Sequence, residues 1–155
     1  MVEQATLDDI PQLCILLDEL FSQEAEFTPN HEIQGKGLSK IINNEDVGAI
    51  LVCRASTIMP QFNKIIGMVN ILYTISTALG ERVANLEDFV VLPEFRNIGV
   101  GSELISHAML FAKAKGCQRI TLLTDDDNQD AHRFYVRNGF SRSSMVPFRR
   151  NLLTT

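Results

Sequence analysis

Cysteine is scarce in this sequence, and the three that occur, Cys14, Cys53 and Cys117, are far apart. An odd number of separated cysteines supplies neither a disulfide framework nor the ligand spacing of a zinc site. The three histidines share no metal-ligand spacing with cysteines or carboxylates either, so we expect no metal site. Buried, reduced thiols are the simpler interpretation, and they are typical of a cytoplasmic protein.

Positive charge and long apolar runs are also in short supply. The chain has 14 Lys and Arg against 19 Asp and Glu, a net charge of -5, and no basic cluster forms a stripe. We therefore expect no nucleic-acid partner. No apolar run approaches the roughly eighteen residues needed to cross a membrane. The N-terminal stretch "MVEQATLDDI" has no basic segment followed by an apolar one, so we expect neither export nor a membrane partner, and a cytoplasmic location.

The chain does contain enough apolar residues for one core, since 45% of its 155 residues are hydrophobic. No repeat, low-complexity tract or linker divides it, so we expect a single domain over residues 1–155. Apolar, β-branched runs and segments of helical period follow one another along the chain. The predicted order is a short strand, a helix ending near Phe21, a helix through Ile42, strands at 47–55, 64–76 and 82–92, a helix at 98–115, a strand at 119–124, a helix at 128–138 and a short strand pair from Phe140 onward.

Two glycines stand where the helix at 98–115 has to begin, in "RNIGVG", residues 96–101. A helix N-terminus exposes unpaired N–H groups and a partial positive charge, and it attracts an anion if no bulky side chain intervenes. Gly99 and Gly101 leave that space open, and Arg96 adds a guanidinium. The alternative is that the glycines serve only a tight turn. The stretch is neither a P-loop, because no Gly-Lys-Ser/Thr follows, nor a dinucleotide fingerprint, because a third glycine is missing.

A second motif follows further along the chain, in "NQDAHRFYVRNGF", residues 128–140. Together with "RNIGVG" and its lead-in of Val91 and Pro93, it resembles the GCN5-related N-acetyltransferases (GNAT). In that family the first motif binds the pyrophosphate of acetyl-coenzyme A (acetyl-CoA). The residues that match the family's second motif are Asn128, Ala131, Phe134, Tyr135, Gly139 and Phe140.

The resemblance implies an α/β (α+β) fold, the GNAT fold, with a mixed, mostly antiparallel twisted sheet of six to seven strands flanked by about four helices. It also implies acetyl-CoA as cosubstrate and an amine acceptor, either a small molecule or a peptide lysine. A homodimer contact near Arg149 and Arg150 is left open beside an edge strand there. The residues that the resemblance assigns to the cosubstrate are the main chain of Phe89, Val90 and Val91, then Arg96, Asn97, Ile98, Gly99, Val100, Gly101 and Asn128.

Attack of an amine on a thioester calls for a proton acceptor and a proton donor. An ammonium with a pKa of about 10.4 is almost fully protonated at pH 7, so a carboxylate that takes its proton would help. Glu87 and Asp88 lie on the strand before the glycine loop, and period-2 alternation places them on opposite faces. The resemblance favours Glu87. Tyr135 is the candidate proton donor to the departing sulfur, because helical spacing lets it address the same channel as Asn128. Solvated carboxylates and a surface tyrosine are the alternatives.

Other acidic residues receive different expected roles. Asp125 to Asp127 precede a helix and are expected to cap it. The stretch "SQEAEFTPNH", residues 22–31, is the predicted acceptor-specificity loop because Glu24 and Glu26 would attract a cation. The alternative is an ordinary solvated loop. The second hypothesis for the whole chain is a noncatalytic module that binds acyl-CoA and regulates a partner. Tyr135 favours the enzyme, since a binding module has no need of a proton donor at the sulfur.

Overall fold

The computed structural model describes residues 2–22, 28–57 and 63–153. The chain divides into two compact units, residues 1–123 and residues 124–155, and each is described by itself. None of the described helices is long and apolar enough to cross a lipid bilayer.

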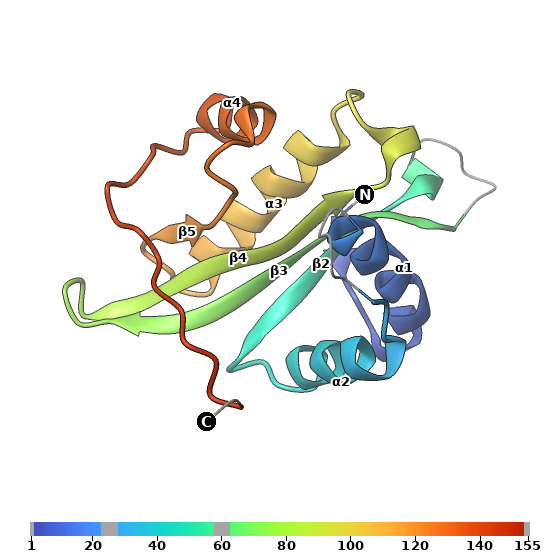
Figure 1. Cartoon of the computed structure of the whole chain (residues 1–155), viewed down its shortest axis with the longest axis horizontal. Helices are drawn as coiled ribbons and strands as arrows, with labels where there is room; N and C mark the ends of the chain where they lie inside the picture. The colour runs from blue at the N-terminus through green and yellow to red at the C-terminus, as the bar shows by residue number, and fades with distance from the viewer. Residues whose placement is uncertain (1, 23–27, 58–62, 154–155) are drawn as a thin grey trace. The chain divides into compact units, whose positions relative to one another are not determined.

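The first unit is built on a mixed five-stranded sheet (Figure 1). The strand order follows the sequence; neighbouring strands are antiparallel, except that the last one runs parallel to its neighbour. This confirms the predicted mixed, mostly antiparallel sheet, with five strands in the described residues instead of six to seven. The strands are β1 (Val2–Gln4), β2 (Gly48–Arg54), β3 (Ile65–Ser76), β4 (Glu81–Val91) and β5 (Ile120–Leu122).

Four helices form where helical periodicity predicted them. In the first unit, α3 covers one face of the sheet and α1 and α2 cover the other (Figure 1). Gly67 of β3 faces α3, since a Cβ there would make ordinary van der Waals contacts, 3.4 Å from Leu104 Cδ2 and 3.5 Å from Val100 Cγ1. The helices are α1 (Ile10–Phe21), α2 (His31–Ile42), α3 (Val100–Ala114) and, in the second unit, α4 (Gln129–Arg137).

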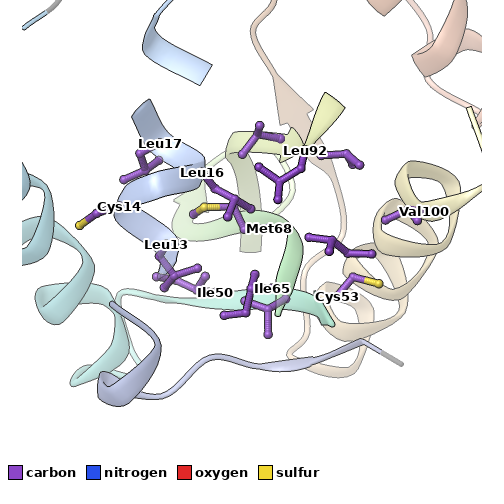
Figure 2. Close-up of a cluster of buried hydrophobic side chains, with 14 of the residues drawn as sticks. Leu13, Cys14, Leu16, Leu17, Ile50, Cys53, Ile65, Met68, Leu92 and Val100 are labelled. Carbon is purple, nitrogen blue, oxygen red and sulfur yellow. The ribbon is translucent and has the colours of Figure 1, made fainter. Parts of the chain in front are cut away.

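A core cluster of the first unit joins α1 to the sheet and also includes Leu38 of α2 and Val100 of α3 (Figure 2). Leu13, Leu16 and Leu17 fall on one face of α1 at helical spacing, and all three are buried. They pack with fully buried side chains of the sheet such as Ile65 and Met68. The cysteines are free thiols; Cys14 and Cys53 are buried and Cys117 is half-buried, in agreement with the expectation from their spacing.

The expected strand pair from Phe140 onward is not present, since residues 140–153 contain no strand. A strand needs a partner for its backbone groups and a surface on which to bury alternate side chains. The apolar residues of this segment find no such surface: Met145 is 86% exposed and Phe148 97%. The prediction failed because an apolar sequence pattern does not by itself supply the neighbouring strand.

A buried ion pair joins β2 to the start of α1. Arg54 Nη2 donates to both carboxylate oxygens of Asp9 at 3.0 Å, and Arg54 Nε donates to the carboxylate of Glu3. Asp9 also accepts from the backbone N–H of Thr6 at 2.9 Å, as in a capping box. The arginine is therefore held by two carboxylates, one of them buried.

Replacement of Arg54 by methionine is expected to lower the free energy of unfolding by about 3–5 kcal/mol, because the Asp9 carboxylate stays buried without its cation. Urea denaturation measures this loss. The matched control is Arg142→Met, which breaks the exposed pair with Asp126 and should change stability by at most about 0.5 kcal/mol. Equal, small losses in the two variants would show that the Arg54 pair adds nothing.

Candidate active site at the end of strand β4

The loop before α3 has the conformation that an anion site requires. After the turn Pro93–Phe95, Asn97 adopts φ 63° and Gly99 adopts φ 94°, and Gly99 is the N-cap of α3. Glycine and asparagine are the residues that enter this left-handed region most readily. No described atom lies within 4 Å of the position that a Cβ on Gly99 would take. The first-turn N–H groups of α3 have no acceptor within the helix, and Gly99 places no side chain beside them.

Arg96 is anchored beside this loop. Its Nε donates to the backbone oxygen of Val91 at 2.8 Å, and its Nη2 lies 3.6 Å from Glu19 Oε1 of α1. The Arg96 side chain is 42% exposed, so the guanidinium is tied to the end of β4 and also reaches solvent. A cation is thus fixed next to the helix N-terminus. An anion of the size of a diphosphate fits this combination of oriented N–H groups, positive charge and open space.

Strand β4 contains a bulge just before this loop. Met68 of β3 pairs with Val90, but Asn70 pairs with Glu87, so two residues of β4 oppose one residue of β3. Asp88, one of the two, has φ 51°, which is uncommon outside glycine. The parallel pairing of β4 with β5 ends at Leu86. Past that residue, β3 is the only described strand that pairs with β4.

The bulge changes how the two neighbouring carboxylates are placed. Glu87 and Asn70 are cross-strand partners and share a face of the sheet. Asp88 was expected on the opposite face, and that expectation is wrong, because Asn70 Nδ2 donates to Asp88 Oδ2 at 2.5 Å. The left-handed backbone at Asp88 interrupts the period-2 alternation on which the expectation depended. Glu87 is exposed, whereas Asp88 is half-buried.

The two carboxyl groups also differ electrostatically. Burial raises the pKa of Asp88, the nearby negative charge of Glu87 raises it further, and the hydrogen bond from Asn70 opposes both effects. A raised pKa makes Asp88 a stronger base once it is ionised. Sequence reasoning missed Asn70 altogether; its only signal was an amide inside the apolar run at 64–76.

The second unit holds the other two predicted site residues, seven positions apart on and before α4. Asn128 is the N-cap of α4, and its Oδ1 accepts from the backbone N–H of Ala131 at 3.1 Å. The helix is therefore capped by Asn128 and not by Asp125 to Asp127, because Asn128 directly precedes the first helical residue, Gln129. The Nδ2 group of the Asn128 amide is not used by this capping bond.

Tyr135 sits between two aromatic rings of the second unit. Its ring makes edge-to-face contacts with Phe134 and Phe140, with centroids 5.3 Å and 5.7 Å away. Burial raises the pKa of the Tyr135 hydroxyl. The hydroxyl therefore keeps its proton over a wider pH range than an exposed tyrosine does, which suits a hydrogen-bond donor.

Most of the predicted site residues thus belong to one continuous segment of the first unit. This segment contains Glu87, Phe89–Val91 and Arg96–Gly101. Asn128 and Tyr135 belong to the second unit. The predicted acceptor residues Glu24 and Glu26 lie outside the described residues. In the described part of the chain, no group of three His, Cys, Asp or Glu side chains could hold a metal ion.

Known proteins resemble this chain over most of its length. Residues 15–140 of the chain match the acetyltransferase (GNAT) family. The chain is 25% identical over 142 residues to an aminoalkylphosphonate N-acetyltransferase of Salmonella typhimurium, covering 92% of this chain and 85% of the relative. It is 27% identical over 103 residues to a glucosamine 6-phosphate N-acetyltransferase of Trypanosoma brucei brucei, covering 66% of this chain and 58% of the relative.

A solved structure shows the same fold. An aminoglycoside acetyltransferase from an uncultured soil metagenomic sample, in complex with sisomicin, superimposes with a TM-score of 0.78 at 20% identity, covering 98% of this chain and 95% of that one. The family match spans most of the sequence, including the glycine loop and the bulge of β4. This chain therefore belongs to the GNAT family, whose members are acetyltransferases that use acetyl-CoA as cosubstrate.

Proposed function

We propose that this protein transfers the acetyl group of acetyl-CoA to a primary amine, on a small molecule or a lysine side chain, by direct attack of the amine. The observation that carries the proposal is the left-handed N-cap at Gly99, open in front and flanked by the anchored Arg96. Such a site recognises a diphosphate, the group that links the two halves of coenzyme A. The bulged, partly separated end of β4 leads directly into it.

The residues that would hold acetyl-CoA follow from this geometry. The diphosphate would be bound by Arg96 and by main-chain N–H groups from Asn97 to Gly101. The main chain of Phe89–Val91 would bind the pantetheine arm and the thioester carbonyl. Asn128 would contribute its side-chain amide. When bound, acetyl-CoA supplies an activated acetyl group as a thioester.

The chain's own proton-transferring groups have distinct tasks. A carboxylate of the β4 bulge, Glu87 or its neighbour Asp88, would accept the proton of the acceptor ammonium, which is otherwise almost fully protonated at pH 7. Tyr135 would donate a hydrogen bond to the sulfur as it leaves, and its raised pKa keeps the donor protonated. The hydrogen bond suffices, because full transfer from a tyrosine with an ordinary pKa near 10 to a thiolate near 8.5 is uphill.

Small-molecule amines are the acceptors that the relatives' names suggest, namely an aminoalkylphosphonate and glucosamine 6-phosphate. All of these proteins share one scaffold, and a scaffold does not select a substrate. A cytoplasmic location remains part of the proposal, resting on the three free thiols. The second candidate, a noncatalytic acyl-CoA-binding module, leaves the protonated Tyr135 without a task.

Thiol release from acetyl-CoA, followed with a chromogenic disulfide, tests the proposal. The panel of acceptors is an aminoalkylphosphonate, glucosamine 6-phosphate, sisomicin and a lysine-containing peptide. We expect saturable thiol release above the no-amine blank with at least one of them. Calorimetry with acetyl-CoA, run in parallel, separates the failures: binding without release favours the noncatalytic module, and no binding by folded protein contradicts both hypotheses.

A further inference from the structure

Asn70 is a buried amide in an otherwise apolar part of the sheet. It is 2% exposed, and its neighbours two residues away on the same face of β3 are Met68 and Leu72. Its Nδ2 donates to Asp88, while its Oδ1 is buried and accepts no hydrogen bond from any described residue. An unsatisfied buried oxygen is a cost that an apolar side chain would avoid. The amide is therefore best explained by what its Nδ2 does for Asp88.

Asp88 is itself held in an unfavourable conformation. Its φ of 51° places a residue with a side chain in the left-handed region, in the middle of a strand. Strained residues of this kind persist where the surrounding structure imposes them, and they cluster at active sites. Here the extra residue in β4 imposes the strain, and the hydrogen bond from Asn70 fixes the direction of the carboxylate. Two independent features thus act on the same carboxyl group.

We propose that Asp88 is the carboxylate that takes the proton of the acceptor ammonium, and that Asn70 is the positioning residue that aims it and stabilises its charged form. This inference rests on the proposed function. In the proton transfer, an N–H bond of the ammonium breaks, an O–H bond forms on Asp88, and the freed electron pair attacks the thioester carbonyl. Glu87 has a supporting part in this arrangement, as the negative neighbour that makes Asp88 more basic.

The charges around Asp88 allow a test of this division of roles. Strand β3 presents the neutral Asn70, and β5 has no titratable residue. On α1, Asp18 is bonded to His31 and Glu19 lies near Arg96. The helix α3, with Glu103, His107 and Lys113, packs on the opposite face, the face of Gly67. Of the described residues, Glu87 supplies the charge that acts on Asp88.

Two substitutions should move the Asp88 titration in opposite directions. Asn70→Leu removes the hydrogen bond to the ionised form, so the pKa of Asp88 should rise. Glu87→Gln removes a like charge, so the pKa should fall. The matched control is Asn85→Leu, which removes an exposed amide from β4, the strand of Asp88, and should do neither. Protein labelled with ¹³C at the aspartate carboxyl carbons reports these shifts without any ligand, and Asp88→Asn identifies the signal.

The same variants should shift the acidic limb of the kcat/KM profile, measured with the most reactive amine of the panel above. In Asn70→Leu the limb moves to higher pH, and kcat/KM at a fixed pH on that limb falls about tenfold, the effect of one pKa unit. In Glu87→Gln the limb moves to lower pH. Acetyl-CoA affinity should stay unchanged in both.

Two results would overturn the assignment: an Asp88 signal that does not respond to Asn70→Leu, or loss of turnover in Glu87→Gln with turnover retained in Asp88→Asn. The second result would make Glu87 the proton acceptor and leave acetyl transfer itself intact. Absence of thiol release with every amine contradicts the proposed function instead. The titration in the free protein still decides in that case whether Asn70 controls Asp88.

Discussion

Gly99→Val is expected to raise the dissociation constant of acetyl-CoA by more than tenfold, the largest binding effect that the structure predicts for a single substitution. The backbone at Gly99 has φ 94°, a conformation that costs a residue with a side chain about 1–2 kcal/mol and a β-branched residue more. If the conformation is kept, the new side chain fills the open space in front of α3. If it is not kept, the N–H groups of the loop turn away from the diphosphate. Isothermal titration calorimetry with acetyl-CoA measures the change.

The control for this experiment is Gly116→Val. Gly116 has φ 88° and, like Gly99, open space around its Cβ position, but it follows the C-terminal end of α3. The two sites are therefore matched in backbone strain and lie about 22 Å apart along the helix. We expect similar losses of thermal stability and a loss of acetyl-CoA affinity in Gly99→Val alone. Equal affinities in two folded variants would remove the glycine loop from the cosubstrate site.

Much of this loop was predictable from sequence because its requirements are local. The order of a strand, an arginine, a glycine and a helical period predicted a helix from residue 98, and α3 begins at Val100, directly after its N-cap Gly99. Helix α2 was also predictable, although Gly35 and Gly37 lie within it. Asn30 caps it by accepting from the N–H of Ile33 at 3.1 Å, and Leu38 is buried.

The bulge in β4 was not predictable in the same way. It arises from the register of two paired strands, in which Asn70 meets Glu87 and Met68 meets Val90. Nothing in the stretch "NLEDFVVL" marks Asp88 as the residue that leaves the alternation, since aspartate is only moderately favoured in the left-handed region. The Asn70–Asp88 hydrogen bond joins residues 18 positions apart, so it becomes visible only when the pairing is known.

The strand pair expected from Phe140 failed for a related reason. Apolar residues such as Met145 and Phe148 are compatible with a strand. A strand also needs a neighbouring strand to pair with, and the sequence pattern does not specify one. Local signals therefore placed the glycine loop, whereas pairing between distant segments decided both the bulge and the C-terminal segment. This difference explains why the expected orientation of Asp88 relative to Glu87 was wrong.

Tyr135→Phe is expected to lower kcat about a hundredfold while acetyl-CoA affinity stays within a factor of two, the scale of losing one proton-donating group. The substitution removes only the hydroxyl group, so the edge-to-face packing of the ring with Phe134 and Phe140 can persist. Since burial raises the pKa of Tyr135, the wild-type rate should hold to a higher pH than an ordinary tyrosine would allow. Steady-state kinetics across the basic limb tests both statements.

Tyr73→Phe is the matched control, since Tyr73 is the chain's other tyrosine and burial raises its pKa as well. Its ring lies on β3, with the guanidinium of Arg82 4.5 Å from the ring centroid. Removing its hydroxyl deletes the same atom from a comparable environment without touching α4, so kcat should not change. Similar small decreases in the two variants would mean that the Tyr135 hydroxyl serves packing alone. A loss of kcat confined to Tyr135→Phe, with unchanged acetyl-CoA affinity, would distinguish a catalyst from a binding module, because a module that only holds acyl-CoA makes no use of a proton donor.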